Sequence, residues 1–368
     1  MLRDAGYTVD VMEVFNDDIE GALNKIKTAA FATYSPSMRD AVAERVRQFG
    51  AEVLHVHNFF PKLTPSVYDG AHAAKCAVVQ TLHNYRLVCP GGLLFREGRV
   101  CEECLGKKFA LPAIRHGCYR GSKVGSATIA TMTAVHRLRG TWASGVERYI
   151  ALNNYAKEVF AANAGIPENR IRVKANVIPD SGIGAHAGTY ALFVGRLSPE
   201  KGIGTLLRAA TSDRFPLQLK IAGTGPMEDE VKAAAASTSR IEFLGAQSRE
   251  RVVELAGNAL VTVVPSEWHE AGGPLVIGEA FSAGVPVVTT RMEPMATVVQ
   301  EGVNGLLYEA GQPEDMCRAL AQIVEQPEMV KKMRIAARVR YEEMYLPENN
   351  LAALVSIYQE AREMLESK

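Results

Sequence analysis

Short runs rich in β-branched residues alternate with helical segments along most of the chain. Ten of these runs are candidate strands, at residues 8–15, 52–57, 77–82, 148–152, 171–174, 190–194, 218–222, 241–244, 260–264 and 286–289. This alternation is typical of parallel sheets that are covered by helices on both faces. The pattern therefore predicts an α/β fold.

A segment without periodicity, residues 177–189, separates the first five candidate strands from the last five. It is rich in Gly, Pro, Asp and Ala, so we expect a hinge between two domains. The predicted division is an N-terminal domain at 1–180 and a C-terminal domain at 181–345. A closing helix at 346–368 has one apolar face and is expected to pack back toward the first domain.

The first residues of the chain predict the last turn of a helix, a glycine cap and then the strand at 8–15. A complete βαβ unit has another strand before such a helix. We therefore expect the first domain to lack its opening strand and to have an unpaired sheet edge.

Length and charge limit the possible functions. The 368 residues suit two domains of ordinary size. The 41 basic and 41 acidic residues argue against nucleic-acid binding through bulk charge. No apolar run reaches the roughly 18 residues that span a bilayer, and the start does not resemble a signal peptide. We expect a cytoplasmic protein whose six cysteines are mostly reduced.

The stretch VVPSEWHEAGGPLVIGEAFSAGVPVV, residues 263–288, places Glu270 and Glu279 on either side of a Gly-Gly-Pro turn. This turn opens an apolar helix that is expected to begin at Pro274 and to carry Glu279. Such a helix start leaves amide donors unpaired, here those of Gly272, Gly273, Leu275 and Val276. Together with the carboxylates, these donors suit sugar hydroxyls and an anion. The alternative is an ordinary strand-loop-helix unit with two solvated glutamates.

Two cations follow the strand at 190–194. Arg196 and Lys201 lie on one loop at the carboxyl edge of the predicted sheet, where α/β proteins bind ligands. Such a pair can hold a diphosphate and stabilise it as a leaving group, although both can also be ordinary surface cations. In the next unit, Gly223 and Gly225 form a tight turn that lets a ligand approach the backbone.

These motifs together resemble glycosyltransferase family 4, the retaining enzymes of GT-B fold. The resemblance rests on GRLSPEKG at 195–202, AGTGP at 222–226, FLG at 243–245, PSEWHEAGGPLVIGEAFSAGVPVV at 265–288 and EGVNGLLYEAGQPEDM at 301–316. The first half looks like members that act in polysaccharide assembly, through HVHNFFPKLTPSV at 55–67, TLHNYRLVCPGGLLFREGRVCEECLG at 81–106 and YIALNNYAKEVF at 149–160. The resemblance implies two Rossmann-like domains that face a central cleft.

The resemblance also implies an activity: transfer of a hexose, with retention, from a UDP- or GDP-sugar to a glycan or lipid-linked glycan, without a catalytic metal. By position, Arg196 and Lys201 would bind the donor diphosphate and Glu279 the ribose. Glu270 and His83 would be the catalytic residues beside the hexose. Gly223, Gly225, Gly272, Gly273, Leu275 and Val276 would complete the donor site.

Three departures from the family pattern bear on this activity. The segment between the two glutamates has one residue more than the family pattern has, and TTRMEPMATVV at 289–299 replaces the usual Gly-Gly and glutamate pattern. The opening strand that is expected to be missing would normally bring a Gly-rich loop. The missing strand and the shifted glutamate keep a second function open. The alternative function is therefore a non-catalytic subunit that binds nucleotide-sugars or acts as a scaffold.

Four cysteines lie in an insertion near residues 86–122. Cys101 and Cys104 have the spacing of a zinc knuckle, and Cys89 and Cys118 can complete a four-sulfur site. Such a closed site would be structural and would stabilise the insertion. Free or disulfide-bonded thiols are the alternative.

The segment 106–148 has eight Lys or Arg residues and one acid, Glu147. Within it, Val124, Ile129, Met132 and Val135 have near-helical spacing. This segment can rest on an anionic membrane surface and present a lipid-linked acceptor, or it can be a solvated face beside a core helix. His57, like His83, follows a candidate strand, and structural and functional interpretations of His57 are equally open.

Overall fold

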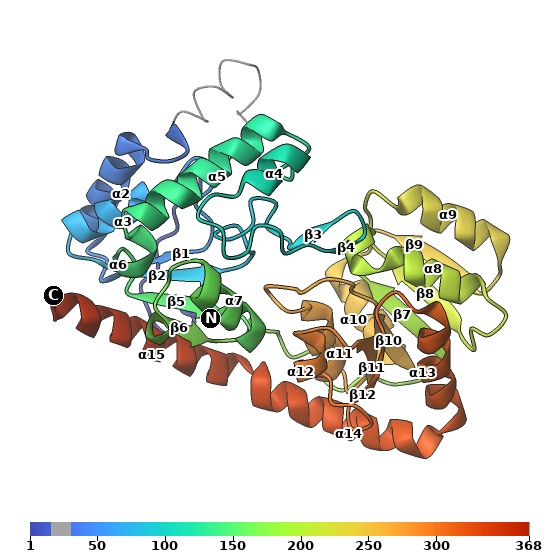
Figure 1. Cartoon of the computed structure of the whole chain (residues 1–368). Coiled ribbons are helices and arrows are strands. Elements are labelled where there is room, and N and C mark those ends of the chain that lie inside the picture. The colour runs from blue at the N-terminus through green and yellow to red at the C-terminus, as the bar shows by residue number, and fades with distance from the viewer. Residues whose placement is uncertain (16–30, 368) are drawn as a thin grey trace. The chain divides into compact units, whose positions relative to one another are not determined.

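The computed structural model describes residues 1–15 and 31–367, which form two compact units (Figure 1). Unit 1 comprises Met1–Leu94, Cys101–Ala175 and Asn350–Lys368, and unit 2 comprises Phe95–Val100 and Asn176–Asn349. The division after Ala175 lies five residues before the predicted boundary at 180. A short hairpin from the cysteine insertion, β3 (Phe95–Arg96) with β4 (Arg99–Val100), groups with unit 2.

Unit 1 is built on a four-stranded parallel sheet in the order β1-β2-β5-β6. These strands are β1 (Val53–Val56), β2 (Ala77–Leu82), β5 (Arg148–Ala151) and β6 (Ile171–Val173). All six residues of β2 are buried, because helices cover both faces of the sheet. The helices are α2 (Pro36–Phe49), α3 (Ser66–Ala73), α4 (Leu111–His116), α5 (Lys123–Leu138), α6 (Thr141–Ser144), α7 (Asn154–Asn163) and α15 (Pro347–Glu366).

The last helix, α15, belongs to the core of unit 1. Leu354, Ile357 and Ala361 on one of its faces are buried in a cluster with Ala77 and Ile150 of the sheet. The apolar periodicity at 346–368 therefore corresponds to a face that packs on the strands, and the chain returns to unit 1 at Asn350.

The segment at residues 8–15 is not a strand, which corrects the prediction. Val9, Met12 and Val14 are half-buried and the other residues are exposed, and the segment forms no ladder with a neighbouring strand. An apolar, β-branched run is insufficient for a strand when no partner supplies the inter-strand hydrogen bonds. The segment is held instead by Arg45 of α2, which donates to Asp10 at 2.6 and 2.8 Å and to the carbonyl of Val11 at 3.2 Å.

Helix α5 begins where Ser122 accepts a hydrogen bond from the amide of Gly125 at 3.0 Å. Ile129 and Met132 of this helix are fully buried. The apolar stripe that suggested a membrane-facing surface is therefore core-facing at these two positions. Val124 and Leu138 at its ends are exposed, at 72% and 84%.

Unit 2 contains a six-stranded parallel sheet in the order β12-β11-β10-β7-β8-β9. The strands are β7 (Tyr190–Val194), β8 (Gln218–Ala222), β9 (Ile241–Gly245), β10 (Val261–Val264), β11 (Val287–Thr290) and β12 (Gly305–Tyr308). β10 and β11 are buried throughout, as expected of a sheet with helices on both faces. The predicted α/β fold with two parallel sheets is thus confirmed. The sequence pattern missed β12, because its residues, Gly305–Tyr308, include no β-branched residue.

The helices of unit 2 cover this sheet and include the short 3₁₀ turn η2. They are η2 (Pro199–Lys201), α8 (Ile203–Thr211), α9 (Glu228–Ser237), α10 (Arg249–Asn258), α11 (Leu275–Ser282), α12 (Met295–Val298), α13 (Pro313–Glu325) and α14 (Pro327–Met344). α8 and α13 have strongly apolar faces, and their Leu206 and Leu320 are fully buried in the same core as Ile221 of β8.

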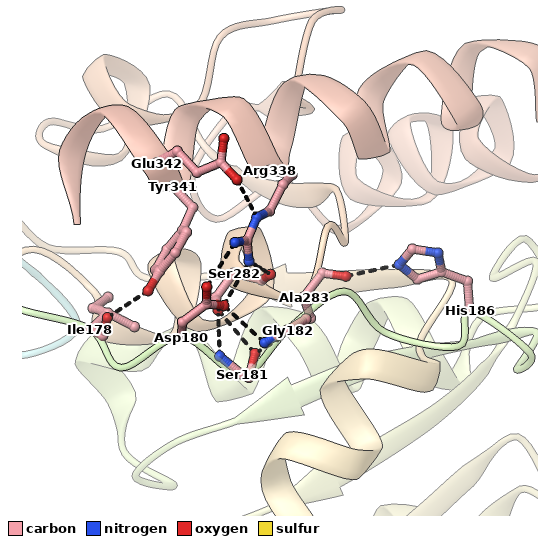
Figure 2. A network of polar contacts seen from close by, with 10 residues as sticks. All are labelled: Ile178, Asp180, Ser181, Gly182, His186, Ser282, Ala283, Arg338, Tyr341 and Glu342. Atoms are coloured by element: carbon pink, nitrogen blue, oxygen red, sulfur yellow. Dashed lines mark hydrogen bonds and ion pairs between the residues drawn. The ribbon is translucent and has the colours of Figure 1, made fainter. Parts of the chain in front are cut away.

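The predicted hinge at 177–189 is attached to unit 2 over most of its length. Figure 2 shows Arg338 of α14 reaching Asp180, to which its two terminal nitrogens donate at 2.7 Å each. Arg338 also donates to the carbonyl of Ser282, at the end of α11, at 2.8 Å. This fork of charged hydrogen bonds holds the pKa of Asp180 well below its usual range.

Backbone contacts continue on both sides of this ion pair (Figure 2). Tyr341 donates its hydroxyl to the carbonyl of Ile178 at 2.9 Å, and the amide of Ser181 donates to the Ser282 hydroxyl at 2.9 Å. The His186 ring nitrogen Nε2 lies 2.9 Å from the carbonyl of Ala283. The segment is therefore a clamp on the carboxyl end of α11, and the chain passes from unit 1 into unit 2 at Asn176, just before this segment.

Candidate functional site

Three loops pack closely at the carboxyl edge of β8, β7 and β10, and glycines make this possible. A Cβ added at Gly223 would lie 1.9 Å from the carbonyl oxygen of Gly195, and one at Gly202 would lie 1.8 Å from the carbonyl oxygen of Pro265. Gly202 also has a φ of 70°, in the left-handed region that favours glycine. The loop backbones are thus fixed, which places the side chains between them reproducibly.

Lys201 and Glu270 form the centre of this region. The ammonium Nζ of Lys201 lies 2.6 Å from Oε1 of Glu270, and the Ser266 hydroxyl donates to the same oxygen at 2.6 Å. Glu270 is only 5% exposed. Lys201 also lies over the ring of Trp268, 5.7 Å from its centroid. The structure thus joins a predicted diphosphate-binding residue directly to a predicted catalytic residue.

Ser266 and Trp268 were not predicted as site residues. Each is near Glu270 in the sequence, but neither the spacing nor the residue type indicated that its side chain would turn toward Lys201. A strand that ends in a polar loop signals only that the loop is a candidate site.

Arg196 is separate from this pair. Its side chain is exposed, and in the part of the chain that the structure describes it makes no ion pair. The loop backbone below it is fixed, since the amide of the next residue, Leu197, donates to the carbonyl of Thr224 at 2.9 Å. Arg196 is therefore a solvated cation on a rigid loop, able to bind an anion without first breaking another contact.

The start of α11 differs from the prediction by one residue. Pro274 is the N-cap and Leu275 the first helical residue. The Gly273 amide, predicted as an unpaired donor, instead donates to the carbonyl of Glu270 at 3.3 Å, which closes a turn before the helix. The amides of Leu275 and Val276 remain as donors, because the first amides of a helix have no intrahelical acceptor.

Glu279 lies in the second turn of α11 and is half-buried. Burial raises the pKa of its carboxyl group, an effect that the charge of Arg249 on α10 partly offsets. Because the clamp on Ser282 fixes the other end of this short helix, the position of Glu279 is determined from both ends.

In unit 1, His57 and His83 follow the neighbouring strands β1 and β2 and contact each other. The nitrogen Nδ1 of His57 lies 2.8 Å from Nε2 of His83. Partial burial lowers the pKa of each imidazole, and Lys174 further lowers that of His57. The sequence did not indicate that His55, inside β1, stacks on His57 with ring centroids 4.3 Å apart.

The four cysteines of the insertion lie near one another, and none of them is in a disulfide bond among the described residues. Burial raises the pKa of Cys104 to about 11, and the neighbouring thiols of Cys89, Cys118 and Cys101 contribute. Among residues 1–15 and 31–367, no group of three or more His, Cys, Asp or Glu side chains is arranged to hold a metal ion. These thiols are neighbours without coordination geometry, so zinc binding stays a prediction. The remaining two cysteines, Cys76 and Cys317, are buried.

No helix among the described residues is both long and apolar enough to cross a bilayer.

Comparison of sequences identifies the second unit. Residues 184–340 match the family model for glycosyl transferases group 1. The D-inositol 3-phosphate glycosyltransferase of Nocardiopsis dassonvillei is 34% identical over 173 residues, which cover 42% of this chain and 39% of that protein. An uncharacterised glycosyltransferase of Methanocaldococcus jannaschii is 29% identical over 146 residues, or 39% of this chain and 40% of that protein. These matches span about two fifths of the length of the curated relatives.

Comparison of structures extends over both units. HepE of Anabaena in complex with UDP has a TM-score of 0.64 and 17% identity, and the match covers 91% of this chain and 85% of that one. A glycosyltransferase of Rickettsia africae has a TM-score of 0.67 and 14% identity, with 98% and 86% covered. Residues 184–340 therefore form a glycosyl transferases group 1 domain, and the chain has the two-domain GT-B fold of these structures.

Proposed function

We propose that this chain is a retaining glycosyltransferase, which moves a hexose from a UDP- or GDP-sugar to a glycan or lipid-linked glycan in polysaccharide assembly. The observation that carries the proposal is the Lys201–Glu270 pair, 2.6 Å apart, at the carboxyl edge of the sheet in the group 1 domain. A cation and a carboxylate fixed side by side suit the two halves of a nucleotide-sugar, the anionic diphosphate and the hydroxylated hexose.

The chemistry of the reaction explains why these groups are useful. Departure of a nucleoside diphosphate builds negative charge on the leaving oxygen, and the sugar becomes oxocarbenium-like. Lys201, Arg196 and the amides at the start of α11 would offset the negative charge. Glu270 would lie near the electron-poor sugar, and Glu279 would accept hydrogen bonds from the ribose hydroxyls. His83 would be the second catalytic residue, as the resemblance implies.

Known structures with this fold support the choice of ligands. Anabaena HepE was solved with UDP and with UDP-glucose. TarM of S. aureus was solved with UDP and α-GlcNAc-glycerol, and WaaB is a lipopolysaccharide outer core galactosyltransferase. By analogy of fold alone, a uridine nucleotide is the first donor to test and a glycan the first acceptor.

A peripheral membrane contact would fit a lipid-linked acceptor. The segment 106–148 exposes Leu111, Val124 and Leu138 among its cations, even though the centre of α5 is core. We propose that these side chains rest on an anionic bilayer surface at the cytoplasmic face.

The test is donor turnover. The purified chain is incubated with a series of UDP- and GDP-sugars, and release of the nucleotide and the anomeric configuration of the product are followed. Retention with one donor class is expected, and Glu279→Gln should raise the donor KM more than it lowers kcat. Binding of nucleotide without any turnover would refute the enzyme proposal in favour of a binding or scaffold subunit.

A further inference from the structure

A chain of polar contacts connects three histidines of unit 1 with its last helix. His55 lies within β1, His57 follows β1, and His83 follows β2, the adjacent parallel strand. Because parallel strands end at the same edge of a sheet, the side chains after β1 and β2 meet there. The contact between Nδ1 of His57 and Nε2 of His83, at 2.8 Å, is the result.

This contact couples the tautomers of the two rings. One nitrogen must donate its N–H and the other must accept, so that the two neutral imidazoles share one proton position. If His57 donates, the remaining proton of His83 is on Nδ1. If His83 donates, its Nδ1 has no proton and can accept a hydrogen bond. The tautomer of His57 therefore decides whether Nδ1 of His83 donates a hydrogen bond to a sugar hydroxyl or accepts one from it.

His57 itself has a fixed support. His55 stacks on it, with ring centroids 4.3 Å apart and planes inclined by 29°. Both nitrogens of His55 have partners: Nδ1 lies 2.7 Å from the hydroxyl of Tyr358 on α15, and Nε2 lies 2.8 Å from the hydroxyl of Thr81 on β2. Burial lowers the pKa of His55 to about 3, so this ring is a neutral platform.

Lys174 is a nearby cation that lowers the pKa values of His55 and His57. It follows β6, and its ammonium is held by the side-chain carbonyl of Asn350 at 2.7 Å. Burial is the main cause of the lowered pKa values of His55 and His57, and the charge of Lys174 lowers both further. A neutral His83 is what an electron-poor sugar requires, since an imidazolium would repel it.

We propose that His57 is a positioning residue, which holds the imidazole of His83 in one tautomer and one orientation through their shared hydrogen bond. The inference rests on the proposed function, in which His83 works beside the hexose. The outer contacts, from His55 to Tyr358, keep His57 in place by stacking and connect this edge of the sheet to α15.

Two substitutions separate the hydrogen bond from the ring. His57→Phe retains an aromatic ring to stack on His55 and removes the nitrogen, whereas His57→Asn places an amide near the former Nδ1 position. Histidine-selective ¹⁵N NMR of the full chain, with His83 assigned through His83→Asn, reports the tautomer without any need for activity. The eight histidines make such a spectrum tractable.

A single neutral tautomer of His83 is expected in the wild type and in His57→Asn, and a mixture or the opposite tautomer in His57→Phe. In turnover, His57→Phe should lower kcat about tenfold with little change in donor KM, the effect of losing one aligned hydrogen bond, and His57→Asn should restore most of it. If His57→Phe does not fold, His57→Ala replaces it in both measurements.

An unchanged His83 spectrum in the folded His57→Phe variant would overturn the inference, as would equal kcat for the Phe and Asn variants. A wild-type chain that turns over no sugar would instead refute the proposed function. The NMR measurement would still decide whether His57 controls the tautomer of His83, so that the two failures are distinguishable.

Discussion

Replacement of Lys201 by methionine tests the ion pair at the centre of the proposed donor site. Methionine retains most of the aliphatic volume beside Trp268 but removes the ammonium group that lies 2.6 Å from Glu270. The side chain of Glu270 is 6% exposed and that of Lys201 is 26% exposed, so water reaches the cation more easily than the carboxylate. Removal of the cation is therefore expected to cost more than neutralisation of the carboxylate.

The magnitude follows from the geometry. At 2.6 Å, the gross Coulomb attraction at an effective dielectric constant of about 20 is about 6 kcal/mol. Part of this is offset because Lys201 loses hydration in the pair, and Ser266 continues to donate to the carboxylate. Breaking a buried pair from one side typically costs about 3 kcal/mol, which we expect for Lys201→Met. Glu270→Gln keeps an acceptor for Ser266 and should cost about 1 kcal/mol.

Urea unfolding measures this difference. The chain has two tryptophans, Trp142 in unit 1 and Trp268 in unit 2, so fluorescence in a Trp142→Phe background reports unit 2. Lys331→Met is the matched control, because Lys331 is 67% exposed in its pair with Glu328. A double Lys201→Met and Glu270→Gln variant should be more stable than Lys201→Met alone. If Lys201→Met unfolded like the control, the pair would not be the buried interaction described above.

Four further outcomes are expected. Asp180→Asn should lower the free energy of unfolding of unit 2 by about 1 kcal/mol in urea titrations, because Asp180 is 41% exposed and water screens its pair; no change would contradict the clamp on α11. Burial lowers the pKa of Lys174 to about 8, from 10.5 for an exposed lysine. Between these pH values the unfolded chain binds more protons than the folded chain, so the free energy of unfolding should rise with pH relative to Lys174→Met. Parallel pH profiles of the two proteins would contradict this. Val124→Glu with Leu138→Glu should reduce sedimentation with anionic vesicles and leave the fold intact by circular dichroism; unchanged binding would refute the membrane contact. Chelator-washed protein should retain about one equivalent of zinc in elemental analysis, and less than about half would count against a four-thiolate site formed by Cys89, Cys101, Cys104 and Cys118.

The sequence predicted those parts of the fold that depend on local pattern. Buried parallel strands such as β10 show a continuous apolar run, and the start of α11 shows its proline and glycines. The segment at 8–15 has the β-branched and apolar residues of a strand. A strand exists only where another chain segment supplies its hydrogen bonds, and no local pattern contains that information.

The sequence identified single residues of the candidate site, but it did not predict which of their side chains contact each other. The family resemblance assigned roles to Lys201 and Glu270, which are 69 residues apart in the sequence. Only the folded structure shows that their side chains are in contact. The same holds for His57 and His83, whose contact depends on the order β1-β2, and for Tyr358, which reaches His55 across 303 residues. Contacts between distant segments follow from topology, which single-sequence periodicity does not specify.

The most direct test of the nucleotide site is calorimetric titration of UDP into the wild type, Arg196→Ala and an Arg318→Ala control. Arg196 is exposed and makes no ion pair among the described residues, so its loss should leave the fold unchanged, unlike that of Lys201. Arg318 is 71% exposed on α13 and controls for the loss of one surface charge. One charge-assisted hydrogen bond to a phosphate, about 1.5 kcal/mol, predicts roughly tenfold weaker binding for Arg196→Ala and no change for the control. Equal affinity of all three proteins for UDP, or no binding by the wild type, would contradict the account.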